Sequence, residues 1–519
     1  MRIIRLLLLL TSSLLAAAAG QSAARFDVVE ATIADIHAAF ASGDLTCRAL
    51  VGLYLDRIDA YDKNGPALNA VVMVNPNATV VADSLDRQYA RGAPVGPLHC
   101  IPVIVKDNFQ TAGLRTTAGS ESLAEFIPED DAFQVARVKE AGGIVLFKSN
   151  MAEFAFSPYE TVSSILPGYT RNPYALNRVT AGSSGGTAAG VASSFGAAGL
   201  GTDTGNSIRG PSAHQALVGI RSTMGLTSRA GVVPLNLAAD IAGPMARTVA
   251  DAVAVFQAIA GEDPTDAVTA RSRGRVHANY ASFLDRDGLR GARIGVLREA
   301  YQRPTTDPEV ERVFRTALDD MRRAGATIID SASIDGFDEL MRNRRGGCSQ
   351  FKFDLNAYLA GLGDQVPVHS LEEIIESRDF HPTIRDRLQG GQEADVAPED
   401  NPACERLEGF REDLRAAVLA TMERHQLDAF VYPTWSNPPR LIGDLNTPHG
   451  DNSQVFSPST GFPAIQVPMG YVRGGILPAG MSLFGRPWRE DVLIRLAFAY
   501  EQATRHRRPP TTTPPLNHH

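Results

Sequence analysis

The chain has 519 residues, of which 44% are hydrophobic and 21% are charged, a composition typical of globular proteins. Its formal net charge is −8 at pH 7, and its isoelectric point is near 5.8. This acidic balance leaves no basic stripe, so nucleic acid is not expected as a partner. The length allows one large hydrophobic core or two to three smaller ones.

Residues 1–20 depart from this composition and have the layout of a secretory signal peptide. Arg2 and Arg5 form a positive start, and a short apolar core and a run of small side chains follow. An uncleaved membrane anchor is the alternative, but a bilayer needs about 20 apolar residues and this core is shorter. We therefore expect cleavage between Ala18 and Ala24, no membrane anchor afterwards, and a secreted or periplasmic location.

Four cysteines follow, at Cys47, Cys100, Cys348 and Cys404. In an exported chain this even number permits two disulfides, and four cysteines allow three different pairings. Proximity along the chain favours Cys47–Cys100 and Cys348–Cys404, but the sequence does not decide among the three. No cysteine belongs to a C-x-x-C motif, so neither a zinc site nor a redox pair is expected.

Short apolar β-rich runs alternate with amphipathic helical patterns, which predicts an α/β fold. Apolar residues recur every three or four positions within residues 27–62, and Ser42 and Gly43 interrupt the pattern, which indicates two helices. Further helices are predicted at residues 134–141, 308–324, 405–426 and 490–504. Strands are predicted at residues 101–105 and 144–147 and, after residue 427, in DAFVYPT, FPAIQVPMG and AGMSLFG.

Changes in composition indicate one main domain, residues 25–507, with an inserted lobe. Residues 262–425 carry more charge and longer amphipathic patterns than the rest, which predicts a peripheral helical lobe. The chain returns to short strands and a final helix in residues 427–507. Residues 508–519 are rich in Pro and Thr and are predicted to be disordered.

The first chemically unusual segment is I-P-V-I-V-K-D-N at residues 101–108, an apolar strand-like run that ends in Lys106. Burial disfavours the charged form of a lysine, and a neutral amine is a base. The alternative is a lysine that reaches the surface or pairs with Asp107. This segment alone does not distinguish a catalytic base from a structural lysine.

The second segment, A-G-S-S-G-G-T-A-A-G at residues 181–190, is a Gly/Ser turn that leads into an Ala-rich helix. A helix N-terminus can hold a phosphate, but the segment lacks the Lys-Ser/Thr ending of a P-loop. It also fits the pattern G-x-S-x-G, which would make Ser184 a nucleophile as in α/β-hydrolases. Alternatively its serines relay protons for a nucleophile elsewhere, or the turn is only structural.

The third segment, G-L-G-T-D-T-G-N-S-I-R-G at residues 199–210, places Ser207 on a tight Gly/Asn turn. Successive backbone N–H groups converge in such a turn, as an oxyanion hole for acyl transfer requires. A structural glycine turn is the alternative, although such a turn does not need a serine.

Together the three segments resemble the defining stretch of the amidase signature family. The resemblance rests on Lys106 in VKDN, on Ser183 and Ser184 in AGSSGG, and on Ser207 in GTDTGNSIRG, with the family's spacing between relay serine and nucleophile. It extends to GPLHCIPVIVKDN, VGIRSTMGLTSRAGVVPL, AGPMARTVADA, FPAIQVPMG and LAFAYEQATRHRRPP. It places a signature core at about residues 95–260 and implies a large twisted mixed β-sheet covered by helices on both faces, with the active site at the sheet's edge beneath the lobe.

The resemblance implies a Ser-Ser-Lys relay that uses no cofactor and no metal. In the family's mechanism neutral Lys106 accepts a proton from Ser183, which follows a cis peptide bond, and Ser183 deprotonates the nucleophile Ser207. The oxyanion would be held by the backbone N–H groups of Thr204, Gly205, Asn206 and Ser207.

Ser184, Asp203 and Arg209 are expected to support the site by hydrogen bonds and ion pairing rather than to react. Two positions depart from the family's commonest pattern. Asn206 replaces a glycine; Asn tolerates φ > 0, and its side chain is expected to narrow the acyl side of the pocket. Cys100 also replaces a common glycine, which agrees with a local disulfide.

The expected activity is hydrolysis of carboxamide bonds in peptide C-terminal amides or in small aliphatic or aryl amides, and the layout most resembles bacterial peptide amidases. Aryl acylamidase, carbamate or ester hydrolysis on the same relay is the alternative. An amidotransferase subunit that serves aminoacyl-tRNA shares the signature, but the signal peptide and the acidic charge argue against it. A hydrolase centred on Ser184 and an inactive binding protein are further alternatives. Monomer and homodimer are both compatible with the sequence.

Four aromatic side chains in the second half are candidates either for an apolar substrate pocket or for the hydrophobic core: Phe351, Phe353, Tyr358 and Trp435.

Overall fold

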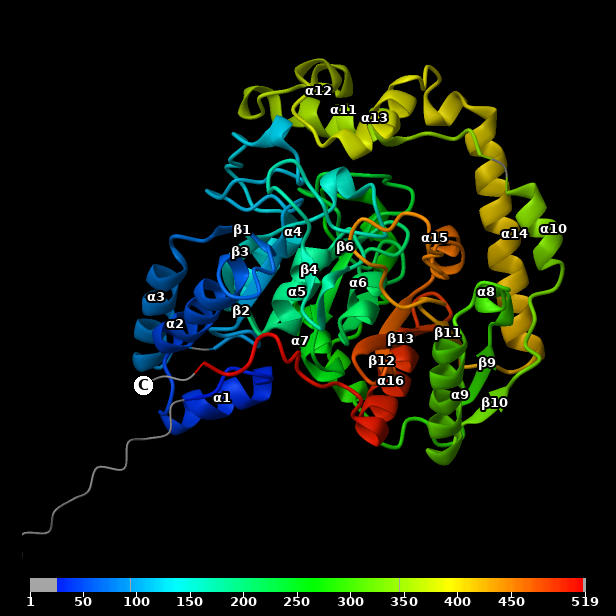
Figure 1. Cartoon of the computed structure of the whole chain (residues 1–519), viewed down its shortest axis with the longest axis horizontal. Helices are drawn as coiled ribbons and strands as arrows, with labels where there is room; N and C mark the ends of the chain where they lie inside the picture. Colours follow the sequence, from blue (N-terminus) through cyan, green and yellow to red (C-terminus); the bar gives the residue numbers. More distant parts are fainter. Residues whose placement is uncertain (1–25, 94, 345, 517–519) are drawn as a thin grey trace, which may run out of the picture.

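The computed structural model describes residues 26–93, 95–344 and 346–516 (Figure 1), so the predicted signal peptide lies outside the described residues. One sheet of 11 strands runs through the molecule, in the order β1-β3-β2-β6-β8-β7-β12-β13-β11-β9-β10. In that order the strands are β1 (Val71–Val74), β3 (Ile144–Ser149), β2 (Pro102–Lys106), β6 (Ala198–Asp203), β8 (Ile241–Ala246), β7 (Val218–Arg221), β12 (Ala464–Val472), β13 (Leu477–Phe484), β11 (Ala429–Pro433), β9 (Arg293–Val296) and β10 (Thr327–Ile329).

The sheet is mixed, as expected. Strand β2 runs parallel to β3 and β6, the strands from β6 to β11 pair antiparallel, and β9 and β10 continue parallel to β11. Every residue of β2, β3, β6 and β13 is buried, which explains why these strands are continuous apolar or small runs without polar alternation. A separate two-stranded sheet consists of β4 (Arg171–Asn172) and β5 (Ala175–Val179).

Helices cover both faces of the sheet (Figure 1). Helices α5 (Gly185–Ala192) and α6 (Arg209–His214) pack together on one face, whereas α4, α7, α16 and α9 form a row on the other. The bounds of these four are Phe133–Glu140, Val249–Ile259, Glu490–Thr504 and Pro308–Arg323. The remaining α-helices are α1 (Ile33–Ser42), α2 (Cys47–Ile58), α3 (Ala78–Ala90), α8 (Arg298–Tyr301), α10 (Phe337–Asn343), α11 (Phe351–Leu362), α12 (Leu371–Ser377), α13 (Arg385–Gln392), α14 (Pro402–Arg424) and α15 (Phe456–Thr460).

The two helices predicted within residues 27–62 are confirmed as α1 and α2. Helix α1 begins with a capping box in which Thr32 and Asp35 satisfy each other's backbone N–H groups. It ends at Gly43, whose φ of 79° lies in the left-handed region that glycine adopts readily. The predicted helices at 134–141, 308–324, 405–426 and 490–504 correspond to α4, α9, α14 and α16.

The predicted lobe is only partly peripheral. Strands β9 and β10 lie within residues 262–425, yet they extend the main sheet because β9 pairs directly with β11. Helices α11 to α13 do form a separate cap at the top of Figure 1. They share a small apolar cluster, including Phe351 and Leu355, that packs on Phe154 and Phe156 of the main domain.

The chain end expected to be disordered is instead packed against the body as far as residue 516. The buried Arg57 guanidinium donates to the carbonyl oxygens of Thr513 and Pro514, at 2.8 and 2.9 Å. The Tyr61 hydroxyl also donates to the Pro514 carbonyl, at 2.9 Å. Because an extended Pro-rich segment offers free carbonyl groups, a buried cation can order it without regular secondary structure. Residues 517–519 lie outside the described residues.

Both favoured disulfides are present, Cys47–Cys100 and Cys348–Cys404. The φ of Cys100 is +61°, in the left-handed region, which explains why glycine is common at this position in relatives. Across the described residues, none of the helices is long and apolar enough to cross a membrane.

Candidate active site

Lys106, the last residue of β2, lies in the interior with no exposed surface. Its Nζ donates to Ser183 Oγ at 2.7 Å and to Thr202 Oγ1 at 2.6 Å. Burial lowers its pKa from 10.5 to about 7, although the nearby carboxylates of Asp240 and Asp203 act in the opposite direction. The amine is therefore substantially neutral near pH 7 and able to accept a proton.

The loop that carries Ser183 packs against β6. The peptide bond between Gly182 and Ser183 is cis, as expected, and a side chain at Gly182 would collide with backbone carbonyl oxygens of residues 157 and 160. Ser184 is fully buried. Its hydroxyl donates to the carbonyl of Thr202 at 3.2 Å and accepts from the N–H of Thr202 at 3.4 Å. Ser184 therefore fastens the loop to β6.

Small residues make this close packing possible. A β-carbon at Gly199 in β6 would lie 2.5 Å from the Thr187 methyl group of α5, and one at Gly201 would lie 3.0 Å from Ser184 Oγ. Such approaches are sterically prohibited or tight, so the glycines of β6 let α5 and the serine loop lie directly on the strand. The Gly/Ala/Ser-rich composition noted in the sequence thus serves the site.

Asp203, at the end of β6, braces the turn that follows. Its carboxylate accepts the N–H groups of Ile208 and Arg209, at 3.2 and 3.3 Å. It also forms fully buried ion pairs with Arg209 at 3.0 Å and Arg221 at 3.1 Å. Burial alone would raise the pKa of Asp203, but the two guanidinium groups hold it at about 2. The carboxylate is therefore ionised, and its protonation plays no part near neutral pH.

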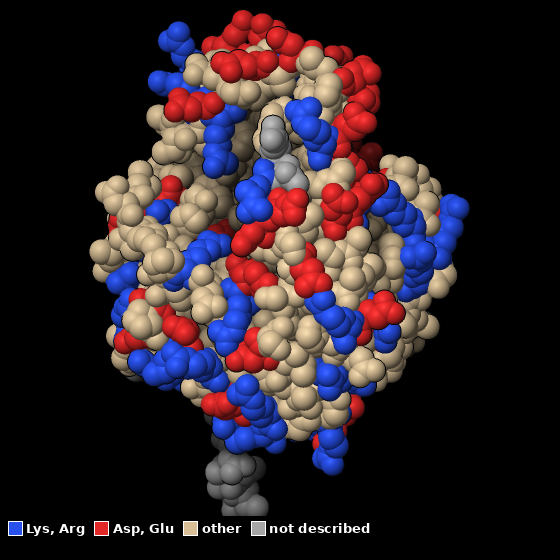
Figure 2. All heavy atoms as spheres, turned by 90° about the vertical axis from the view of Figure 1, so that its right-hand side faces the viewer, with Lys and Arg blue, Asp and Glu red and all other residues tan. Residues whose placement is uncertain are grey.

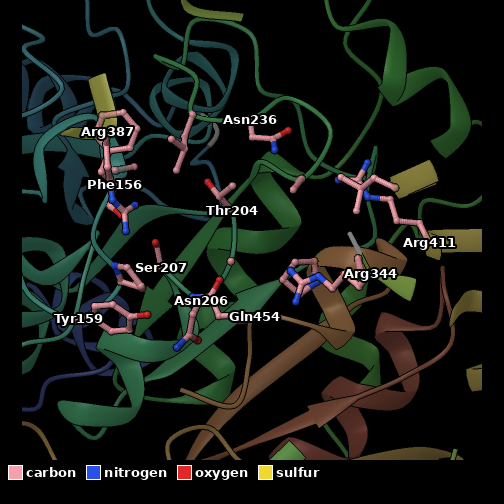
Figure 3. Close-up of a pocket in the computed structure, with 18 residues that line it drawn as sticks. Phe156, Tyr159, Thr204, Asn206, Ser207, Asn236, Arg344, Arg387, Arg411 and Gln454 are labelled. Carbon is pink, nitrogen blue, oxygen red and sulfur yellow. The ribbon is translucent and has the colours of Figure 1, made fainter. Parts of the chain in front are cut away.

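The turn between Asp203 and α6 presents free donors. The N–H groups of Gly205, Asn206 and Ser207 have no acceptor in the described chain. The Ser207 hydroxyl also has no hydrogen-bond partner among the described residues, and it points into a cavity (Figure 3). A free hydroxyl beside several unpaired N–H groups is the arrangement that acyl transfer requires.

The cavity has a volume of about 400 Å³. All four residues of the expected oxyanion turn line it, whereas Lys106 and Ser183 lie behind its wall. Its other lining residues come from the loop after β3, from residues 235–239, from the lobe and from the region of α15; they include Phe156, Tyr159, Leu235, Asn236, Arg344, Arg387, Leu407, Arg411, Gln454 and Ser459. The cavity therefore lies between the sheet and the lobe, as the resemblance implied.

The explanation expected for Asn206 is wrong in one respect, because its φ is not positive and the turn has no need of a residue that tolerates that region. Its side chain is instead held from behind: the amide donates to Asp451 at 2.9 Å. The other oxygen of Asp451 accepts from Gln454 at 2.7 Å. Burial raises the pKa of Asp451 to about 6. A β-carbon at Gly205 would collide with the Gln454 side chain, so this layer sets the shape of the turn.

None of the four aromatic pocket candidates lines the cavity. Phe351 belongs to the apolar cluster of the lobe, and Trp435 is buried and donates to the carbonyl of Gly210 at 3.0 Å. Tyr358 accepts a hydrogen bond from Gln110, and Phe353 is half-buried. The aromatic lining comes from Phe156 and Tyr159, which no short motif marks in the sequence.

One cluster has the ligand spacing of a metal site. Single ligand atoms of Cys47, His99 and Cys100 lie within 4.8 Å of one another. The two sulfur atoms are bonded in the Cys47–Cys100 disulfide, which accounts for their proximity and leaves them unavailable as thiolate ligands.

Comparison with known proteins gives a consistent result. The family model described as Amidase matches residues 49–494. A probable amidase of Arabidopsis thaliana is 34% identical over 509 residues, covering 94% of this chain and 93% of the plant protein. The native peptide amidase of Stenotrophomonas maltophilia superposes with a TM-score of 0.83 at 37% identity, covering 93% of this chain and 99% of that one. The A-type subunit of the glutamyl-tRNA(Gln) amidotransferase from Thermotoga maritima gives 0.69 at 26%, covering 92% and 95%.

Proposed function

This chain belongs to the Amidase family and is an amide-hydrolysing enzyme; we propose that it cuts carboxamide bonds through an acyl-enzyme on Ser207. The observation that carries the proposal is the buried Lys106, with a pKa of about 7, hydrogen-bonded to Ser183 at 2.7 Å. The loop of Ser183 packs on β6, and β6 leads directly into the Ser207 turn.

In the proposed reaction the lone pair of neutral Lys106 accepts the Ser183 proton along their existing contact. Ser183 takes the proton of Ser207 as the Ser207 oxygen attacks the carbonyl carbon of the amide. The N–H groups of Gly205, Asn206 and Ser207, joined by that of Thr204, stabilise the negative oxygen. Ser183 then returns the proton to the leaving nitrogen, the C–N bond breaks, and ammonia or an amine departs.

The second half of the reaction uses the same groups. A water molecule loses its proton to the Ser183–Lys106 relay and attacks the Ser207 ester. The tetrahedral intermediate collapses, Ser207 regains its proton, and a carboxylic acid is released. Esters and carbamates pass through the same type of intermediate, so aryl acylamidase, carbamate or ester hydrolysis is the alternative on this relay.

A nucleophilic Ser184 is disfavoured by its surroundings. Its hydroxyl is fully buried and is bonded to both backbone groups of Thr202, whereas the Ser207 hydroxyl faces the cavity. A nucleophile must reach the substrate, and Ser207 meets that condition.

An amidotransferase component is the second candidate, because this chain is similar to one from Thermotoga maritima. The peptide amidase of Stenotrophomonas maltophilia is the better match in both TM-score and identity. We therefore favour peptide C-terminal amides and small aliphatic or aryl amides as substrates. We also propose that the chain is exported, on the basis of the signal peptide in its sequence. It would act as a monomer or homodimer.

The test is ammonia or amine release from peptide amides, aryl anilides and free glutamine by the mature chain. Ser207→Ala and Lys106→Ala should lose activity by several orders of magnitude, and Ser184→Ala should keep a measurable part. A Ser207→Ala variant with near-normal turnover would contradict the proposal. Turnover of glutamine alone, among all these substrates, would favour the amidotransferase function.

A further inference from the structure

The cavity of Ser207 carries a positive charge that the proposed mechanism does not use. Arg344, Arg387 and Arg411 line it, and no acidic side chain does. Arg344 directly follows α10, Arg387 lies on α13 and Arg411 on α14, so all three come from the lobe that covers the site (Figure 3).

Two of these arginines have no carboxylate partner in the described part of the chain. Arg344 lies 6.0 Å from the centroid of the Phe410 ring. Arg387 lies 5.8 Å from that of Phe156 and donates to the backbone carbonyl of the same residue. Arg411, by contrast, pairs with Glu408 at 3.2 Å. Aromatic rings and one carbonyl position the two guanidinium groups but do not neutralise them.

The arginines also act on one another. The pKa of Arg344 is lowered by partial desolvation and by the positive charge of Arg411. Like charges that face a common cavity without an acid between them repel, and a bound anion removes that repulsion. A guanidinium group offers parallel N–H donors that match the two oxygens of a carboxylate.

Acidic groups near the cavity do not supply this anion. Asp451 is buried behind the wall, where its oxygens accept from Asn206 and Gln454. Beyond Arg411 the cavity adjoins a second one of about 640 Å³, where Glu408 and Glu412 lie among further arginines. Figure 2 shows side chains of both signs around the hollow below the upper lobe. The unbalanced charge therefore belongs to the lining of the Ser207 cavity rather than to this whole face.

We propose that Arg344 and Arg387 bind a carboxylate on the acyl part of the substrate, so that the enzyme prefers amides of acidic acyl groups. Amidated peptides with a glutamate next to the scissile amide, or one residue before it, belong to this class. The inference rests on the proposed function, since it requires that the substrate of Ser207 occupies this cavity.

The test compares kcat/KM for matched peptide amides that carry Glu, Gln or Lys at either of these two positions. Glu and Gln have nearly the same shape, so their ratio isolates the charge. We expect the wild type to prefer Glu to Gln by about tenfold or more at one position, and this preference to shrink as salt is added. Arg344→Gln and Arg387→Gln should each move the ratio towards one and leave the Gln substrate within about threefold of wild type.

Matched controls lie two residues away on the same segments. Arg342→Gln and Arg385→Gln remove the same charge from positions that do not line the cavity, and they should keep the wild-type ratio. A wild-type ratio at or below one at both positions would overturn the inference. So would arginine variants that lose the Glu and Gln substrates in parallel.

Binding to the inactive Ser207→Ala variant separates this inference from the proposed function. Calorimetry with the same amides should show tighter binding of Glu than of Gln, and a second substitution at Arg344 or Arg387 should abolish the difference. Retained preference with no wild-type turnover would support the anion site and reject the reaction. Equal binding of the two amides would reject the anion site whatever the turnover.

Discussion

The pH dependence of catalysis should follow the ionisation of Lys106. Its pKa of about 7 means that roughly half of the amine is neutral at pH 7, whereas a lysine at the ordinary value of 10.5 would be about 0.03% neutral. Burial thus increases the amount of usable base by about three orders of magnitude. Because only the neutral form accepts a proton, kcat/KM should rise about tenfold per pH unit below pH 7 and level off above it.

The assay is initial-rate ammonia release from a peptide amide between pH 5 and pH 9, with circular dichroism at each pH to verify folding. Lys106→Met should lose roughly a thousandfold in kcat/KM, within the range known for general bases. Lys148→Met is the matched control, because Lys148 is equally buried, on the neighbouring β3, and bonds to Thr116 and the Phe109 carbonyl rather than to the relay. If Lys148→Met does not fold, Lys106→Arg keeps the charge without the base and should be as inactive as Lys106→Met.

Two results would refute this reasoning. One is a rising limb with its midpoint near the ordinary pKa of lysine, which would mean that burial does not tune the base. The other is a folded Lys106→Met variant that retains more than about a tenth of the activity, since general-base catalysis contributes at least about a hundredfold.

Three further predictions concern stability and processing. Asp203→Asn should lower the free energy of unfolding by about 3–5 kcal/mol, because it leaves the buried Arg209 and Arg221 without their carboxylate; a loss below about 1 kcal/mol in urea titration would argue against this. Replacing both Cys47 and Cys100 by Ser should cost about 2–4 kcal/mol by removing the constraint on the unfolded chain, and an unchanged melting temperature would contradict it. Expression of the full chain in a bacterium should yield an exported protein that starts within the predicted cleavage region, which N-terminal sequencing checks; an uncleaved, cell-retained chain would show the signal-peptide prediction to be incorrect.

The residues of the relay could be named from the sequence because they lie in contiguous motifs. Lys106 ends a buried strand, and Ser183 and Ser207 sit in turns whose glycines restrict what the backbone can do. Local periodicity likewise predicted the long helices α9 and α16, whose apolar faces repeat along one segment.

Features that depend on distant contacts were missed for a common reason. Arg344, Arg387 and Arg411 look like ordinary surface cations in the sequence, and only the folded lobe brings them to one cavity. The Pro-rich chain end is ordered by Arg57, which lies 456 positions before Thr513 in the chain. Strand β9 joins the sheet through β11, on the far side of the lobe helices in sequence, so composition alone assigned it to the lobe.

Covalent labelling of the nucleophile tests the central claim most directly. A fluorophosphonate reacts with an activated serine hydroxyl and leaves a stable adduct that mass spectrometry of the digested chain can locate. We predict a single adduct on Ser207, lost in Ser207→Ala and strongly slowed in Lys106→Met, with Ser184→Ala still labelled. An adduct on Ser184, or labelling of Ser207→Ala at the wild-type rate, would contradict the account.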